Sequence, residues 1–174
     1  MTHAEMVALL RDGVAVPGGT WADLGAGSGN FTRALRQLVG PQAVIYAVDR
    51  DAAALQGQTD ALVVRADFTQ PLDLPPLDGI LMANALHWIR QPAPLLVRLA
   101  NRLRPAGSLL LVEYAVDAPR SYVPFPVPYA RFETLAQAAG FTAVRQVGAR
   151  RSPSSGIMMY AAVAQKAASV EVRN

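Results

Sequence analysis

The sequence predicts an α/β fold: a seven-stranded, mostly parallel β-sheet with helices on both faces and an antiparallel hairpin at its C-terminal end. Short apolar runs alternate with segments of helical periodicity from residue 20 to about residue 140, and this alternation is typical of a parallel sheet. The last two apolar runs, 142–149 and 157–165, are joined by a link too short to hold a crossover helix. These two strands are therefore expected to pair antiparallel.

Composition indicates one compact domain over residues 1–174, with a helix and linker in 1–19 and the core in 20–166. Of the 174 residues, 52% are hydrophobic and 17% are charged, which favours a globular chain with a sizeable core. No apolar run approaches the roughly 20 residues needed to span a bilayer. The first residues do not show the pattern of a signal peptide either. We therefore expect a cytoplasmic protein without a membrane partner.

Residue usage also limits the chemistry. The chain has no cysteine, so disulfides, thiolate catalysis and cysteine-ligated zinc are excluded. His3 and His87 are the only histidines and are far apart in sequence, and no metal site is expected. The net charge of +3 comes from dispersed arginines. Ordinary solvated surface charge explains it, and nucleic acid is not favoured as a partner.

The N-terminal half is expected to alternate helices and strands. Thr2 and Glu5 have the spacing of a capping box, and Gly40-Pro41 ends the helix that follows the first strand. The expected elements are a helix from Thr2 to Leu10, a strand at Thr20–Leu24, a helix with Phe31, Leu35 and Leu38 on its inner face, a strand at Ala43–Val48, a short helix at Asp51–Gln58, and strands at Ala61–Ala66 and Leu77–Ala83.

The C-terminal half is expected to hold two helices and three strands. Pro92 suits the first turn of a helix, and Gly140 suits a helix C-cap. The proline-rich stretch from Ala118 to Pro128 is expected to be irregular. The expected elements are helices at Pro92–Arg104 and Tyr129–Ala139 and strands at Ser108–Tyr114, Thr142–Ala149 and Ile157–Gln165.

A glycine-rich turn follows the first strand and is the most informative motif. Gly25, Gly27 and Gly29 alternate with other residues, so the turn lacks side chains at these positions and its backbone can approach a ligand closely. A dinucleotide-binding fingerprint, G-x-G-x-x-G, would need glycine where the chain has Asn30. Asp23 lies two residues before the first glycine. The helix that follows offers free N–H groups to an anion.

Polar side chains also follow the next three strands. Asp49 ends the second strand, Asp67 and Phe68 follow the third, and Asn84 follows the fourth. Open α/β sheets bind ligands at the carboxyl ends of their strands. A carboxylate such as Asp49 can accept two hydrogen bonds from a ribose diol. The alternatives are local: Asp49 before Asp51 or Asp67 before Thr69 could simply cap a turn.

From about Trp21 to about Lys166 these motifs resemble the class I S-adenosylmethionine-dependent methyltransferases of the small-molecule type, similar to the methyltransferase-11 group. The resemblance implies a Rossmann-like fold, S-adenosyl-L-methionine as cofactor and methyl transfer to an acceptor, for which a small molecule is favoured. A non-catalytic S-adenosylmethionine-binding or assembly protein, and a methyltransferase acting on RNA or protein, are the alternatives. The oligomeric state is open, with a homo-oligomer as one option. The implied cofactor-binding residues are Asp23, Gly25, Ala26, Gly27, Gly29, Asp49, Arg50, Asp67, Phe68 and Asn84.

The segment from Ala83 to Trp88 is expected at the rim of the acceptor site. Related enzymes that methylate amino nitrogens of bases or glutamine carry Asn/Asp-Pro-Pro-Tyr/Phe here, whereas this chain has Ala85 and Leu86. Asn84-Ala85 with Trp88 is similar to small-molecule methyltransferases, including those acting on trans-aconitate. His87 is a candidate base or a structural histidine. The candidate acceptor-pocket residues are Trp88, Glu113, Tyr114, Tyr122 and Phe125.

Overall fold

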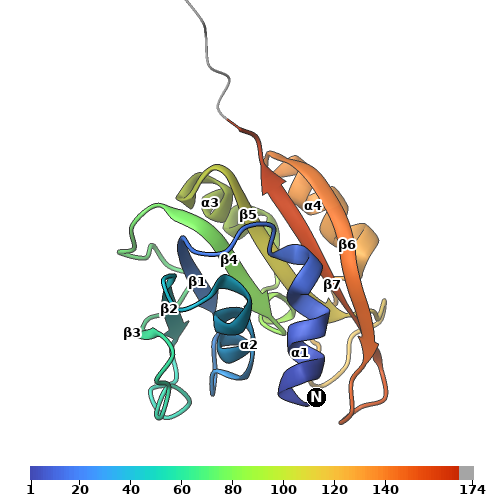
Figure 1. Ribbon diagram of the computed structural model, residues 1–174. Helices are drawn as coiled ribbons and strands as arrows, with labels where there is room; N and C mark the ends of the chain where they lie inside the picture. The colour runs from blue at the N-terminus through green and yellow to red at the C-terminus, as the bar shows by residue number, and fades with distance from the viewer. Residues whose placement is uncertain (169–174) are drawn as a thin grey trace, which may run out of the picture.

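The computed structural model describes residues 1–168 and shows one seven-stranded sheet between two layers of helices (Figure 1). The helices are α1 (His3–Leu10), α2 (Asn30–Val39), α3 (Pro92–Arg102) and α4 (Tyr129–Ala138), with short 3-10 turns η1 (Arg11–Gly13) and η2 (Leu86–Trp88). The strands are β1 (Thr20–Leu24), β2 (Val44–Asp49), β3 (Leu62–Arg65), β4 (Leu77–Ala83), β5 (Leu103–Tyr114), β6 (Phe141–Arg151) and β7 (Met158–Lys166).

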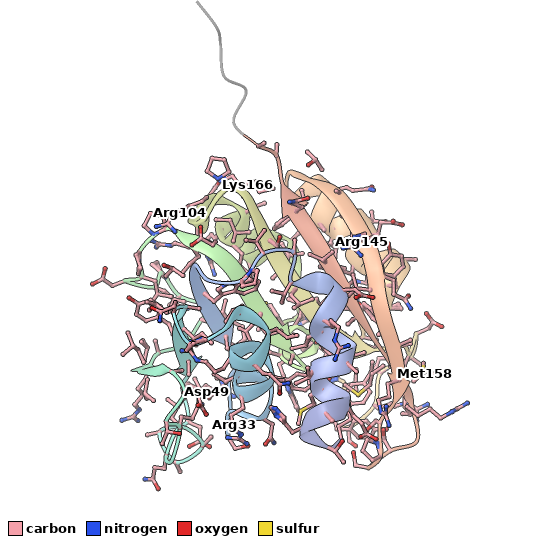
Figure 2. The ribbon with its side chains drawn as sticks, viewed as in Figure 1. Arg33, Asp49, Arg104, Arg145, Met158 and Lys166 are labelled. Carbon is pink, nitrogen blue, oxygen red and sulfur yellow. The ribbon has the colours of Figure 1, made fainter. Side chains whose placement is uncertain are left out.

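The strands lie in the order β3-β2-β1-β4-β5-β7-β6. Neighbours from β3 to β5 pair in parallel, whereas β7 pairs antiparallel with both β5 and β6. This arrangement confirms the mostly parallel Rossmann-like sheet with a C-terminal antiparallel hairpin. The carboxyl ends of β1 to β5 therefore lie along one edge of the sheet. Figure 2 shows Asp49 at this lower edge, while Arg104 and Lys166 lie at the opposite edge.

The core consists of two apolar layers, one on each face of the sheet. Helices α1 and α2 pack on one face through residues such as Leu10 and Leu35, and α3 and α4 pack on the other through residues such as Leu96 and Phe132. The apolar run of β5 from residue 109 to 112 is fully buried. A parallel strand covered on both faces lacks polar alternation for this reason.

The helix expected at Asp51–Gln58 does not form, and that expectation is wrong. Residues 52–57 are turns, in which Asp51 Oδ1 accepts hydrogen bonds from the N–H groups of Ala53 and Ala54. Gly57 has a φ of 81°, outside the helical region. Few residues separate the cap from this glycine, so the cost of starting a helix is not recovered. The neighbouring β3 is short, with Leu62 and Val63 about half exposed.

The boundary between α3 and β5 also differs from the expected one. Helix α3 ends at Arg102 rather than Arg104, and β5 begins at Leu103 rather than Ser108. Leu103 pairs with Leu77 of β4, and the pairing shifts register before it resumes at Gly79. Pro105-Ala106-Gly107 therefore forms an irregular part of the strand, with Ala106 at a φ of 62°, instead of a separate loop.

Gly79 of β4 is expected to tolerate no side chain. It pairs with Trp21 of β1, and a Cβ atom at Gly79 would lie 2.3 Å from the buried indole ring. Gly79→Ala should lower the free energy of unfolding by about 1–3 kcal/mol because the ring has to move within a packed core. Urea denaturation measures this. Val63→Ala, at the exposed edge strand, is the matched control and should change stability by no more than about 0.5 kcal/mol. Equal stability of Gly79→Ala and the parent protein would contradict the packing described here.

Within residues 1–168, none of the helices combines the length and the apolar character needed to cross a membrane.

Candidate functional site

The glycine-rich turn between β1 and α2 is anchored on the end of β2. The N–H groups of Gly25 and Ala26 both donate to the carbonyl of Val48, at 2.8 and 3.1 Å. Gly25, Gly27 and Gly29 have φ values of 79°, 51° and 78°, which favour glycine. A Cβ atom at Gly25 would lie 2.7 Å from the Cβ of Ala85, whereas the space beside Gly27 is open. The turn therefore presents bare backbone at Gly27.

Two side chains hold the backbone on either side of the Gly27 Cα. Its N–H donates to Asp49 Oδ2 at 2.9 Å, and its carbonyl accepts from Gln58 Nε2 at 2.9 Å. Gln58 also covers Gly29, where a Cβ atom would lie 2.8 Å from the Gln58 amide carbon. Sequence reasoning missed Gln58 because it lies in the segment expected to be helical. The conformation of the turn thus depends on the side chain of Asp49, at the end of β2, and on that of Gln58, which follows β2.

Two cavities flank this turn. The acidic cavity, of about 440 Å³, is lined by Gly25, Asp49, Arg50, Asp51, Ala66, Asp67, Phe68, Thr69, Asn84, Ala85, Trp88 and Ile89. The methionine cavity, of about 610 Å³, is lined by Met1, Met6, Asp23, Gly25, Ala26, Gly27, Ser28, Asn30, Phe31, Ala83, Asn84, Tyr114, Ser152, Pro153, Ser154 and Met159. Gly25 and Asn84 line both. The two spaces are therefore adjacent, on either side of one wall.

Most of the residues expected to bind the cofactor line one cavity or the other. Gly29 lines neither: it is the N-cap of α2 and lies under Gln58. Sequence reasoning also missed Ser152 and Met159, because only the folding of the β6–β7 hairpin brings them to the turn. Their sequence neighbourhood carries no signal for this contact.

The carboxylates of the acidic cavity also stabilise local turns. Asp49 Oδ1 accepts from the N–H of Asp51 at 2.9 Å, in addition to the Gly27 bond. Asp67 Oδ1 accepts from the N–H and the hydroxyl of Thr69, at 2.8 and 2.7 Å. These two bonds, with the charge of Arg50, hold the pKa of Asp67 below its usual range. Asp49 and Asp67 can stabilise these turns and still accept hydrogen bonds from a ligand, because an ionised carboxylate offers about four lone-pair sites.

Asp23 is the buried acid of the site. It is 1% exposed, and its Oδ2 accepts from the Thr32 hydroxyl at 2.6 Å. Burial raises the pKa of Asp23 to about 7; the Thr32 hydrogen bond lowers it in part, and the negative charge of Asp49 adds to the rise. A buried carboxyl with such a pKa and an adjacent cavity is a candidate for binding a cationic group.

Asn84 carries two unusual features at the wall between the cavities. Its φ is 55°, in the left-handed region that non-glycine residues rarely adopt. Its Oδ1 is buried without a hydrogen-bond partner, the one such side-chain atom found among the described residues. Buried acceptors are normally paired, and exceptions call for a specific explanation. Together these features indicate a position shaped for a ligand rather than for stability.

His87 and Glu113 form a buried pair that joins η2 to β5. His87 is 2% exposed and Glu113 is fully buried. His87 Nδ1 lies 2.7 Å from Glu113 Oε2, and the His87 backbone N–H donates to Glu113 Oε1 at 3.0 Å. Glu113 was expected in the acceptor pocket, but it lines neither cavity; its carboxylate is used to hold His87. His87 lines neither cavity either.

The aromatic residues expected at the acceptor pocket are divided between several places. Tyr114 lines the methionine cavity, whereas Trp88 is 55% exposed and lines the acidic cavity. Tyr122 packs edge-on against Tyr114, with ring centroids 5.8 Å apart. Phe125 lines neither cavity, and its N–H donates to the His87 carbonyl at 3.1 Å. The proline-rich segment is thus tied to η2 by a backbone hydrogen bond and to β5 by an aromatic contact.

No group of three or more His, Asp or Glu side chains within residues 1–168 is placed to hold a metal ion. Residues 22–109, about half of the chain, match a family model described as a methyltransferase domain. The chain belongs to this methyltransferase family.

Curated relatives of this methyltransferase include an uncharacterized methyltransferase of Mycobacterium tuberculosis, 39% identical over 94 residues that cover 52% of this chain and 37% of the relative. A trans-aconitate 2-methyltransferase of Mycolicibacterium gilvum is 38% identical over 103 residues, covering 56% of this chain and 39% of the relative. The matched part thus spans less than half of the length of these relatives.

A solved structure supports the fold of this chain. Human N-acetylserotonin methyltransferase, in complex with S-adenosylmethionine, superposes with a TM-score of 0.71 at 20% identity, covering 95% of this chain and 52% of that one. At this identity the likeness concerns the fold alone.

Proposed function

We propose that this protein transfers the methyl group of S-adenosyl-L-methionine to a small-molecule acceptor. The observation that carries the proposal is the convergence of Asp23, Asp49 and Asp67 on the glycine turn, beside the unpaired Oδ1 of Asn84. Two adjacent cavities that share a wall suit a ligand with an adenosine part and an amino-acid part. The solved relative bound to this cofactor supports the same choice.

Each acid has a distinct proposed role. Asp49 accepts the ribose hydroxyls, because its carboxylate lines the acidic cavity and retains free lone pairs. Asp67 accepts from the adenine amino group, with Phe68 against the ring face and Arg50 at the rim. Asp23 binds the ammonium of the methionine part, where opposite charge compensates a buried carboxylate. Asn84 Oδ1 gains its missing donor from the same part of the ligand.

When bound, the cofactor supplies a methyl group already activated by the positive sulfonium. An acceptor lone pair then forms the new bond to the methyl carbon as the carbon–sulfur bond breaks, which leaves the neutral thioether S-adenosylhomocysteine. An acceptor hydroxyl, thiol or amine also gives up its proton to water. The chain's contribution is alignment of the two reactants, which can supply effective molarities of about 10⁵ M or more.

His87 acts in this proposal as a positioning residue. Its Nδ1 is engaged by Glu113, and its carbonyl binds Phe125. The imidazole therefore fixes η2 to β5, and the His87 backbone holds the proline-rich segment. No cavity-lining side chain is needed as a base in this proposal, since an activated methyl donor needs alignment more than proton transfer.

Titration calorimetry tests the cofactor assignment. We expect S-adenosylmethionine and S-adenosylhomocysteine to bind and NAD and ATP to bind far more weakly. Preference for NAD or ATP would contradict the proposal. Release of S-adenosylhomocysteine with labelled cofactor, across pooled metabolites and RNA, then separates a small-molecule enzyme from one acting on RNA. Cofactor binding without turnover across such a panel would favour the non-catalytic alternative.

Asn84→Gly isolates the unpaired oxygen. Glycine adopts the left-handed backbone conformation at this position without strain. The backbone between the cavities should therefore keep its conformation while Oδ1 is lost. We expect the dissociation constant for S-adenosylhomocysteine to rise about fivefold, the effect of one hydrogen bond of ~1 kcal/mol. Calorimetry measures it, with circular dichroism to check folding. An unchanged dissociation constant would show that Oδ1 does not contact the ligand.

A further inference from the structure

The methionine cavity has an unusual lining for a polar reaction. Beyond the glycine turn, its wall is built from the thioethers of Met1, Met6 and Met159 and the rings of Phe31 and Tyr114. Met6 and Met159 are 7% and 1% exposed and belong to the core on the α1–α2 face. Methionine side chains are polarizable and make favourable contacts with aromatic rings. This wall therefore suits a flat, apolar molecule.

The polar groups of the same cavity are mostly neutral. Ser28 and Asn30 lie at the turn, and Ser152 and Ser154 lie on the β6–β7 connection, where their hydroxyls are 3.1 Å apart. They can donate or accept hydrogen bonds without adding charge. Asp23 is the single charged side chain in the described wall, and it is negative when ionised.

The arginines adjacent to this wall in sequence are already engaged. Arg33 donates to the Ser28 carbonyl at 3.2 Å and to Asn30 Oδ1 at 2.6 Å. Figure 2 shows Arg33 at the lower edge, on α2. Arg150 of β6 forms an ion pair with Glu5 of α1, and Arg151 donates to the Gly156 carbonyl at 3.0 Å. None of these three arginines lines the cavity.

We infer, on the basis of the proposed function, that the methyl acceptor, bound in the methionine cavity beside the amino-acid part of the cofactor, is an uncharged aromatic or apolar small molecule rather than a di- or tricarboxylate. A carboxylate moved into this wall would lose its hydration and find no side-chain cation to compensate it. The positive groups there are the α-ammonium of Met1, which interacts with the charge of Glu5, and the cofactor ammonium, which pairs with Asp23. A neutral ring loses little hydration and gains contact with the thioethers and Tyr114. The transferred methyl then goes to a hydroxyl, thiol or amine of that molecule, whose proton passes to water.

The experiment uses the full chain and a matched pair of ligands, 2-naphthol and 2-naphthoate, near neutral pH, with trans-aconitate as the polycarboxylate. Calorimetry first measures S-adenosylhomocysteine alone and then each ligand on the saturated protein. We expect 2-naphthol to bind at least about tenfold more tightly than 2-naphthoate, and trans-aconitate to bind more weakly still. Equal or tighter binding of either carboxylate, or no binding of 2-naphthol, overturns the inference.

Two variants locate the ligand. Tyr114→Ala should weaken 2-naphthol binding about fivefold or more while the dissociation constant for S-adenosylhomocysteine stays within about twofold, since the loss is one aromatic contact. Ser154→Arg, at an exposed position of the wall, should strengthen 2-naphthoate binding by adding the missing cation. Unchanged naphthoate binding in Ser154→Arg would place the ligands elsewhere and overturn the inference.

The outcomes separate this inference from the proposed function. Failure of S-adenosylhomocysteine to bind, with 2-naphthol still bound by the free protein, would refute the cofactor assignment and leave the character of the cavity standing. Tight S-adenosylhomocysteine binding together with a preference for trans-aconitate would refute the acceptor class alone.

Discussion

Asp49→Ala is expected to raise the dissociation constant for S-adenosylhomocysteine by about ten- to a hundredfold, or ~1.5–3 kcal/mol. The substitution removes the proposed acceptor for the ribose hydroxyls. It also removes the partner of the Gly27 N–H, which Asp49 Oδ2 holds at 2.9 Å. Both losses weaken binding, and titration calorimetry measures their sum.

Two further variants separate the contribution of the Asp49 charge from that of its hydrogen bond to Gly27 and from that of a neighbouring charge. Asp49→Asn keeps one oxygen that can accept from Gly27 but loses the negative charge, so its dissociation constant should lie between those of the parent and Asp49→Ala. Asp51→Asn removes the charge of a neighbouring carboxylate, whose Oδ1 accepts from the N–H groups of Ala53 and Ala54. It should change the dissociation constant by less than about threefold. A dissociation constant for Asp49→Ala within about twofold of the parent value would refute the ribose assignment.

Asp23 should make cofactor binding strongly dependent on pH. Burial raises the pKa of its carboxyl to about 7, while an ammonium ligand requires the ionised form. Below pH 7 each binding event must therefore release a proton. The dissociation constant for S-adenosylhomocysteine should rise by up to about tenfold for each unit that the pH falls below this value. Calorimetry in a series of buffers measures the slope.

The stability of the free protein should respond to Asp23 in the opposite direction. The folded state keeps the Asp23 proton up to about pH 7, whereas an unfolded aspartate loses it near its usual pKa. The Asp23 contribution to stability is therefore present at low pH, falls as the pH rises toward 7, and then levels off. Its full span is at most about 4 kcal/mol, at ~1.4 kcal/mol per pKa unit.

Asp23→Asn tests both the pH dependence of cofactor binding and the pH dependence of stability. It should flatten the change in stability between acid and neutral pH relative to the parent, and it should remove the pH dependence of binding below neutrality. Thr32→Val loses the hydroxyl that donates to Asp23 Oδ2, so it should shift both transitions to higher pH. Parallel pH profiles for the parent and Asp23→Asn would show that Asp23 does not titrate in this range.

Strands buried on both faces were the most predictable part of the fold. The bounds of β1 and β4 agree with the expected Thr20–Leu24 and Leu77–Ala83, because each is an apolar run between turn-forming residues. The start of α1 agrees as well, since the capping box of Thr2 and Glu5 is a local signal and forms as expected. Segment 51–58 could not be predicted correctly, because its Asp cap and Gly57 compete with weak helical periodicity.

The candidate site was predictable to the extent that sheet topology determines it. Asp23, Asp49, Asp67 and Asn84 lie at or just beyond the carboxyl ends of strands that share one edge, so their proximity follows from the parallel order. The environment of each side chain could not be derived in this way. Glu113 looked like a pocket residue from its place at the end of β5, but its side chain contacts His87, and only the pairing of distant strands decides that.

The double attachment of Gly27 links ligand affinity to the integrity of the fold. Asp49 and Gln58 fix the two peptide units on either side of the Gly27 Cα before any ligand arrives, so little backbone freedom remains to be lost on association. The entropic cost of shaping the turn is met during folding. A substitution that frees the backbone at Gly27 would therefore have two effects. It would lower the melting temperature of the ligand-free protein and make the binding entropy less favourable.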